Sequence, residues 1–316
     1  MNKNFLPFKV LIKGLITFIP GTYKLFCRGT GGTTSARYCY SVWLRHMVLA
    51  KKNNISIIPR VVAEIGPGDS IGIGLSALLS GSDKYFALDA FKHINNYRNI
   101  EIFDELIELF KNKEKIPDDN EFPNILPKLD NYNFPDYILS DDILDKSLDP
   151  ERLGVIKEEL INSSVNGNFI NYFAPWHSSA VIKENSVDFI YSQFVLEHVN
   201  DLELTYKAMN HWLKPKGFMS HMIDFRCHGT ARVNNGHWGY SNFIWKLIVG
   251  GRPFLINRQP LSSHIFYLNK FGFKILNSIK YQSDQGISRE QLSSEFFNLD
   301  DDDLKTWGVF IQIEKV

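Results

Sequence analysis

The chain has 316 residues, of which 44% are hydrophobic and 22% are charged. This composition supplies enough apolar side chain for one enlarged domain or two small ones, and it excludes a disordered or low-complexity chain. Because 35 basic residues balance 35 acidic ones, the chain as a whole is not expected to bind nucleic acid. Three cysteines, an odd number, argue against a disulfide framework and a cysteine-based zinc site, and indicate a reducing, cytoplasmic setting.

Basic residues are concentrated at the N-terminus. The first 60 residues hold ten Lys and Arg side chains and no Asp or Glu, so the rest of the chain is acidic. The apolar, Lys-punctuated stretch at 5–19 is too short and too charged to span a bilayer. Two interpretations stay open for it. It packs on its own domain as a helix, or it lies on an anionic membrane surface as a peripheral contact at the inner face.

Strands and helices alternate along the rest of the chain, and a late strand pair closes it, which predicts a three-layer α/β sandwich. In chain order we expect a helix at 35–52, a strand at 57–65, a helix at 71–79, strands at 84–89, 169–173 and 187–192, a helix at 195–213, a strand at 218–224, a helix at 262–271, and strands at 273–281 and 307–313. We divide the chain into a basic N-terminal helical segment (1–56), an α/β domain (57–94 and 169–316), a Pro-punctuated helical insertion (95–168) and an aromatic-rich substrate insertion (225–258).

The strongest motif joins the first strand to the next helix. The strand runs through Glu64 into Gly66-Pro67-Gly68, and two glycines one residue apart let the backbone turn tightly and approach a ligand. Asp89 closes the following strand, where its carboxylate can accept both hydroxyls of a ribose. These features together predict a nucleoside site.

Two nucleoside ligands compete for this motif. A dinucleotide site needs a third glycine at position 71, which is Ile71 here. S-adenosylmethionine instead carries a cationic sulfonium and an amino-acid tail, with which the carboxylate of Glu64 is compatible.

Four segments, at 64–68, 89, 187–199 and 213–218, occur in the order found in class I S-adenosylmethionine-dependent methyltransferases, and the chain resembles that family. The resemblance implies a Rossmann-like sandwich with a mostly parallel sheet, an antiparallel last strand and helical insertions that form a cap. It implies cofactor contacts at Glu64, Gly66, Pro67, Gly68, Asp89, Ser192 and Gln193.

Two further cofactor contacts are less direct. The acidic residue that the family usually carries after the third strand is absent, so adenine recognition would rest on stacking by Trp176, unless that ring belongs to the core. Arg37, on a helix behind a glycine-rich loop, can pair with a carboxylate, or it is simply a solvated charge.

A narrower resemblance concerns the acceptor. Segments 29–46, 221–228 and 256–258 look similar to methyltransferases of bacterial O-antigen and capsule polysaccharide assembly, which implies a sugar or glycan hydroxyl as acceptor. The hydroxyl must lose a proton, and a neutral His fixed by a carboxylate is a suitable base. Either His221 with Asp224 or Asp224 with His228 could form that pair, and each histidine could instead be structural.

Three alternatives to a metal-independent glycan methyltransferase are less favoured by the sequence. His221, Asp224 and His228, together with Glu197-His198, offer nitrogen and oxygen ligands for a divalent metal that could orient sugar hydroxyls, although we expect no metal site. The acceptor could also be a small metabolite or a lipid-linked precursor. A binding subunit without turnover is the remaining alternative, and the intact motif at Glu64, Gly66, Gly68 and Asp89 argues against it.

Overall fold

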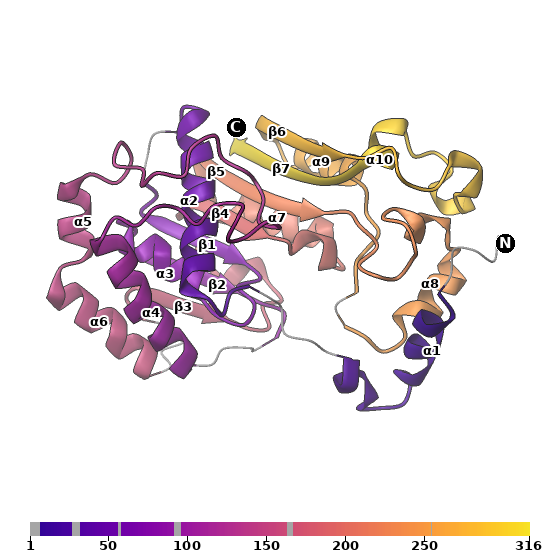
Figure 1. The fold of residues 1–316 in the computed structure, drawn as a ribbon, viewed down its shortest axis with the longest axis horizontal. Helices are drawn as coiled ribbons and strands as arrows, with labels where there is room; N and C mark the ends of the chain where they lie inside the picture. Colours follow the sequence, from indigo (N-terminus) through magenta and orange to yellow (C-terminus); the bar gives the residue numbers. More distant parts are fainter. Residues whose placement is uncertain (1–6, 27–31, 56–57, 92–95, 163–166, 254) are drawn as a thin grey trace.

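The structure, a computed structural model, describes residues 7–26, 32–55, 58–91, 96–162, 167–253 and 255–316 (Figure 1). Seven strands form one sheet in the order β3-β2-β1-β4-β5-β7-β6. All neighbours pair in parallel except β7, which is antiparallel to both β5 and β6. The strands are β1 Val61–Ile65, β2 Lys84–Leu88, β3 Ile170–Phe173, β4 Val187–Gln193, β5 Leu213–Asp224, β6 Phe273–Gln282 and β7 Thr306–Lys315. The predicted Rossmann-like α/β fold with an antiparallel last strand is thereby confirmed.

Helices cover both faces of the sheet because successive strand residues point to opposite sides. Val62 packs in a core with one helical layer, and its neighbour Ala63 packs in a second core with the other layer. The first layer contains α2 Ala36–Lys52, α3 Gly72–Leu79, α4 Asn96–Lys111, α5 Asp141–Ser147 and α6 Pro150–Ile161, and the second contains α7 Leu202–Trp212 and α9 Leu261–Lys270. The remaining helices are α1 Phe8–Ile16, α8 Asn242–Val249 and α10 Asp301–Lys305, with short 3-10 turns that include η1 Thr22–Phe26 and η3 Leu196–His198.

The helical insertion contributes to the fold differently from the expected cap. Its helices α4 and α6 join the layer formed by α2 and α3 and share one core with it, as Figure 1 shows. Of the insertion residues that the structure describes, only those in the loop at 121–125 reach the cavity described below.

Local differences from the predicted elements have local causes. The helix expected at 195–213 is divided, because η3 ends at His198 and Asp201 caps α7 by accepting a bond from the Leu204 amide at 2.8 Å. In the insertion at 225–258, where no regular element was predicted, α8 forms behind a Ser241 cap. Of the strand predicted at 57–65, residue 57 lies outside the described residues, and β1 begins at Val61.

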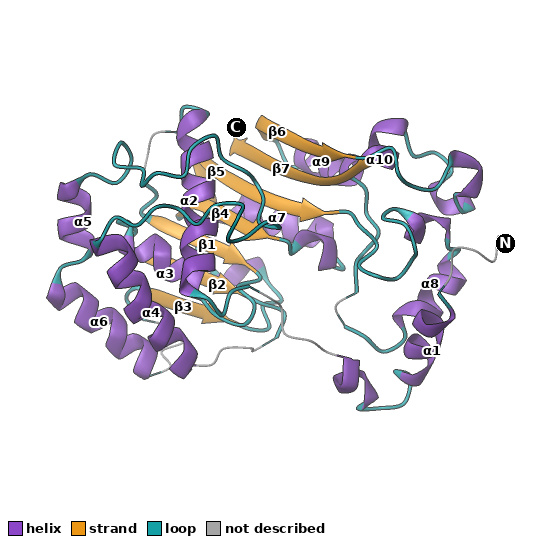
Figure 2. Ribbon diagram, viewed as in Figure 1, coloured by secondary structure: helices purple, strands orange, loops and turns teal. Residues whose placement is uncertain are grey.

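The first helix packs on the aromatic-rich insertion and not on the sheet. Figure 2 shows α1 beside α8, and the two helices share a small core that includes Val10 and Ile248. A side chain at Gly14 would lie 2.0 Å from the Leu247 carbonyl oxygen, so glycine permits this close approach. Among the described residues, no helix is both long and apolar enough to cross a membrane.

One buried cation ties α2 to the loop of the helical insertion. The guanidinium of Arg45 is fully buried and donates to the carbonyl oxygens of Pro127 at 2.8 Å and Pro117 at 3.0 Å. These bonds replace water for two carbonyl groups that the fold has buried, and they position the loop that reaches the cavity.

We therefore expect Arg45→Met to lower the free energy of unfolding by about 2–4 kcal/mol, because buried carbonyls lose their donors. The control is Lys52→Ala on the same helix, whose exposed pair with Asp130 at 2.7 Å should contribute under ~1 kcal/mol. Urea unfolding measures both variants, and equal losses would contradict the anchoring role of Arg45.

Candidate active site

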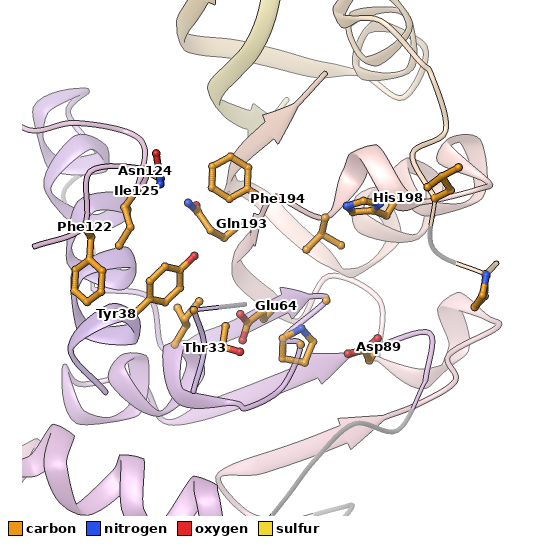
Figure 3. A pocket seen from close by; sticks show the side chains of 18 of the residues that line it. Thr33, Tyr38, Glu64, Asp89, Phe122, Asn124, Ile125, Gln193, Phe194 and His198 are labelled. Carbon is orange, nitrogen blue, oxygen red and sulfur yellow. The ribbon is translucent and has the colours of Figure 1, made fainter. Parts of the chain in front are cut away.

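A cavity of about 740 Å³ lies at the carboxyl ends of β1, β2 and β4 (Figure 3). Its volume is within the usual range for small-molecule sites, and an open α/β sheet binds ligands at this edge. In the figure, Tyr38 and Phe122 stand at one end of the cavity and His198 at the other. The described lining comes from Phe26, 32–38, 64–73, Asp89, the insertion loop 121–125, 193–198, 252–253 and Leu255.

The turn after β1 forms the floor of this cavity. Gly66 and Gly68 have φ of +70° and +76°, in the region that favours glycine. A side chain at Gly66 would lie 2.5 Å from a methyl carbon of Val195, and the Gly66 amide donates to the Leu88 carbonyl at 2.8 Å. The structure thus places Gly66, Pro67 and Gly68 in the cavity wall, as the motif predicts.

Glu64 lines the cavity from the end of β1. Its carboxylate accepts a hydrogen bond from the hydroxyl of Tyr85 and is otherwise deeply buried. Burial raises the pKa of Glu64 to about 7, and the nearby charge of Asp89 acts in the same direction. A cation bound next to Glu64 would therefore favour its ionised form.

Asp89 follows β2 and also lines the cavity. One of its carboxylate oxygens accepts a bond from the Ala90 amide at 2.7 Å, which fixes the side chain at the strand end. Gln193 lines the cavity at the end of β4, where its amide nitrogen donates to the Leu126 carbonyl at 2.9 Å. With the three residues of the turn, the structure therefore brings six of the predicted cofactor residues to one cavity, since Glu64, Asp89 and Gln193 line it as well.

Two other predicted cofactor residues have partners within the protein. Arg37 forms a two-bond ion pair with Glu121, at 2.6 and 2.7 Å, and it positions the loop that lines the cavity instead of lining the cavity itself. Trp176 is half-buried and packs edge-on against Trp212 of α7, with ring centroids 5.3 Å apart, at the margin of the second core. This packing accounts for one side of the ring, and stacking of Trp176 on adenine stays a prediction.

Ser192 and His221 also lie away from the cavity. Both are fully buried in neighbouring strands, where the Ser192 hydroxyl and His221 Nδ1 are 2.8 Å apart. Burial lowers the pKa of His221 to about 3, with the nearby rings of His46 and His264 adding to the effect. The predicted role of His221 as a base paired with Asp224 is therefore wrong, because a ring buried inside the sheet cannot take a proton from a substrate.

The other predicted pair is formed at the end of β5. His228 Nε2 and Asp224 Oδ2 are 3.2 Å apart, and Arg226 holds the same carboxylate at 2.7 Å. Although burial opposes it, hydrogen bonds from His228 and Arg226 hold the pKa of Asp224 well below its usual range. The His228 ring lies against the ring of His198, with centroids 5.1 Å apart, and His198 lines the cavity.

This cluster could also hold a divalent metal. Glu197, His198 and His228 each offer one ligand atom, and these atoms lie within 4.8 Å of one another. Both carboxylate oxygens of Glu197 are buried and have no hydrogen-bond partner among the described residues. Burial raises the pKa of Glu197 well above its usual range. A cation would compensate that buried group, and carboxylate and imidazole ligands suit several divalent ions.

Sequence reasoning missed several residues of the cavity wall. Phe122, Asn124, Arg252 and Leu255 line the cavity, but they come from the two insertions, where no motif marks them. Tyr38, the residue after Arg37, lines the cavity from α2.

Comparison with known proteins agrees with this geometry. The model of a family described as "Methyltransferase domain" matches residues 146–220, a quarter of the chain that spans β3, β4 and α7 and enters β5. This match confirms the predicted enzyme class and cofactor. The protein is a methyltransferase that uses S-adenosylmethionine. No curated protein matches the chain.

Solved methyltransferase structures are similar to this chain with low sequence identity and low TM-scores. An S-adenosylmethionine-dependent methyltransferase from Mesorhizobium loti is 11% identical, covers 84% of this chain and 96% of its own, and has a TM-score of 0.39. For one from Methanosarcina mazei the values are 14%, 84%, 97% and 0.40. Phosphoethanolamine N-methyltransferase 2 from Haemonchus contortus, in complex with S-adenosyl-L-methionine, is 12% identical over 96% of this chain and 56% of its own, with a TM-score of 0.42. The strand order of the sheet, with β7 antiparallel to its neighbours, defines the fold.

Replacing Asp89 tests the ribose contact. We expect Asp89→Ala to weaken binding of S-adenosylmethionine by tenfold or more, because a charge-assisted contact contributes about 1.5–3 kcal/mol. Asp83→Ala, at the opposite end of β2 and paired with exposed Arg60, should leave the affinity unchanged. Titration calorimetry measures both, and wild-type affinity in Asp89→Ala would remove Asp89 from the cofactor site.

The raised pKa of Glu64 predicts a pH dependence of cofactor affinity. Ionised Glu64 attracts the cationic ligand. The affinity for S-adenosylmethionine should therefore rise by about tenfold from pH 6 to pH 8, as the carboxyl group of Glu64 loses its proton. Titrations of wild type and Glu64→Gln across this range isolate the effect, since ionisation of the ligand is common to both. Parallel curves for the two proteins would contradict the prediction.

Proposed function

We propose that this methyltransferase transfers the methyl group of S-adenosylmethionine to a hydroxyl of a sugar or surface glycan, with His228 and Asp224 as the proton-accepting pair. The observation that carries the proposal is the Asp224–His228 hydrogen bond beside His198, which lines the same cavity as Glu64 and Asp89.

The chain's own residues can supply the base that oxygen methylation requires. When bound, S-adenosylmethionine supplies an electrophilic methyl group on a sulfonium. Because His228 Nε2 donates to Asp224, the lone pair of the neutral ring lies on Nδ1, which can accept the hydroxyl proton directly or by way of His198. Asp224 then stabilises the imidazolium, a role that its low pKa favours.

Backbone strain at the site also supports a functional role. His228 has a φ of +46° and Phe194, in the cavity wall, a φ of +56°. Non-glycine residues seldom adopt these angles, and such residues cluster at active sites because the surrounding structure holds them there.

The saccharide acceptor is supported by where three segments lie. The segments that resemble polysaccharide methyltransferases include Tyr38, His228 and Asn257. Tyr38 lines the cavity, and His228 pairs with Asp224. The Asn257 side-chain amide donates to the carbonyls of Leu196 and Val199, at 2.8 Å each, on both sides of His198. A small metabolite or lipid-linked precursor with a hydroxyl group would use the same chemistry.

Replacing His228 tests the base. With labelled S-adenosylmethionine and a panel of saccharide acceptors, we expect His228→Ala to lower kcat about a hundredfold while cofactor affinity stays at the wild-type value. His177→Ala, at an exposed position after β3, is the matched control and should keep full turnover. Full turnover in His228→Ala would exclude His228 as the base.

Chelation separates the base from the metal chemistry. If EDTA abolishes wild-type turnover and a divalent ion restores it, Glu197, His198 and His228 act as ligands, and His228 is not the base. Turnover that is insensitive to EDTA supports the Asp224–His228 pair.

A further inference from the structure

The segment from α1 to η1 exposes an unusual amount of apolar side chain. Phe8 is 73% exposed, Phe18 57%, Ile19 60% and Leu25 77%, and Leu15 on α1 is 46% exposed. Single exposed apolar residues are common on proteins, but a run of them on one short segment marks an interaction surface. We call the exposed side of residues 8–25 the α1 surface.

This exposure does not come from an undocked helix. Val10 and Leu11 pack into the core shared with α8, and Gly14 meets the α8 backbone. At about 100° per residue, Phe8 and Leu15 project about 130° away from Val10 and Gly14, and Leu11 lies between the two sides. One side of α1 is therefore fixed to the protein, and the other is apolar and exposed.

The unit that carries this surface is strongly cationic. It consists of α1, η1 and the insertion 225–258, and neither the first 60 residues nor 225–258 contains an Asp or Glu. Lys9 and Lys13 are exposed on α1 beside the apolar side chains, and Arg232 and Lys246 are exposed on the insertion. Glu295, an acid that contacts the unit, accepts a bond from the Asn242 amide at 3.0 Å.

We infer that the α1 surface is a docking site for an anionic lipid bilayer. Apolar side chains flanked by lysines suit a helix that lies at the boundary of headgroups and acyl chains. Each cation near an anionic leaflet contributes about 1 kcal/mol, and the attraction decays within a Debye length. A second copy of this chain is a poorer occupant, because a two-fold contact would bring the same cationic unit against itself.

Docking would bring the active site to the lipid surface. Phe26, which ends η1, and Arg252 and Leu255, which follow α8, all line the cavity. If the proposed hydroxyl methylation is correct, an acceptor anchored in the bilayer would reach the cavity through this unit. Lipid docking itself does not depend on that reaction.

Vesicle sedimentation with the full chain tests the inference. We expect the protein to pellet with vesicles of phosphatidylglycerol and phosphatidylcholine in equal parts, and to stay in solution with phosphatidylcholine alone. High salt should release it. The double variants Phe8→Ser/Leu15→Ser and Lys9→Glu/Lys13→Glu should each weaken binding tenfold or more. Phe266→Ser on α9, where the side chain is 59% exposed, is the matched control and should bind as wild type.

Two further measurements make the result decisive. Thermal unfolding and affinity for S-adenosylmethionine should be unchanged in all variants, which shows that the fold and cofactor site are intact. A wild-type protein that stays in solution with anionic vesicles at low salt overturns the inference, as does wild-type binding by Phe8→Ser/Leu15→Ser. A concentration-dependent dimer that these substitutions dissociate, without vesicle binding, would assign the surface to a second copy instead.

Discussion

A side chain at position 66 would collide with Val195, and the geometry of the site follows from the close approach that this glycine permits. The turn after β1 fits between the ends of its two neighbours, held to β2 by the bond from the Gly66 amide to Leu88. Because parallel strands bring their carboxyl ends to one edge, Glu64, Asp89 and Gln193 meet around this turn. The methyltransferase site is thus a consequence of backbone contact at the centre of the sheet.

Burial divides the histidines of the site into two groups. His221 and His46 are sealed inside the protein with hydroxyl partners, and burial lowers their pKa values to about 3 and 4, so they stay neutral and structural. The His228 side chain is 30% exposed and is held by a carboxylate that stays ionised. Since a base must exchange its proton with substrate or solvent, this difference in exposure favours His228 over His221 as the proposed base.

The sequence left two interpretations of the N-terminal segment open, packing on its own domain and contact with a membrane surface, and the placement of α1 is compatible with both. One side of α1 packs on the insertion through Val10 and Gly14, and the other exposes Phe8 and Leu15 with lysines beside them. Packing and membrane contact are compatible because they use different sides of one helix. The fixed orientation of α1 would give the active site a defined position relative to a membrane.

Local patterns were sufficient for the order of strands and helices, for the turn at Gly66 and Gly68, and for the strand-end carboxylates Glu64 and Asp89. Strand periodicity and glycine requirements are properties of neighbouring residues, so they can be recognised along the chain. Contacts between distant segments decided that His221 is buried beside Ser192 whereas His228 pairs with Asp224. They also paired Arg37 with Glu121 and brought the loop at 121–125 to the cavity. No local pattern encodes these outcomes, because burial and pairing depend on which segments pack together once the sheet has formed.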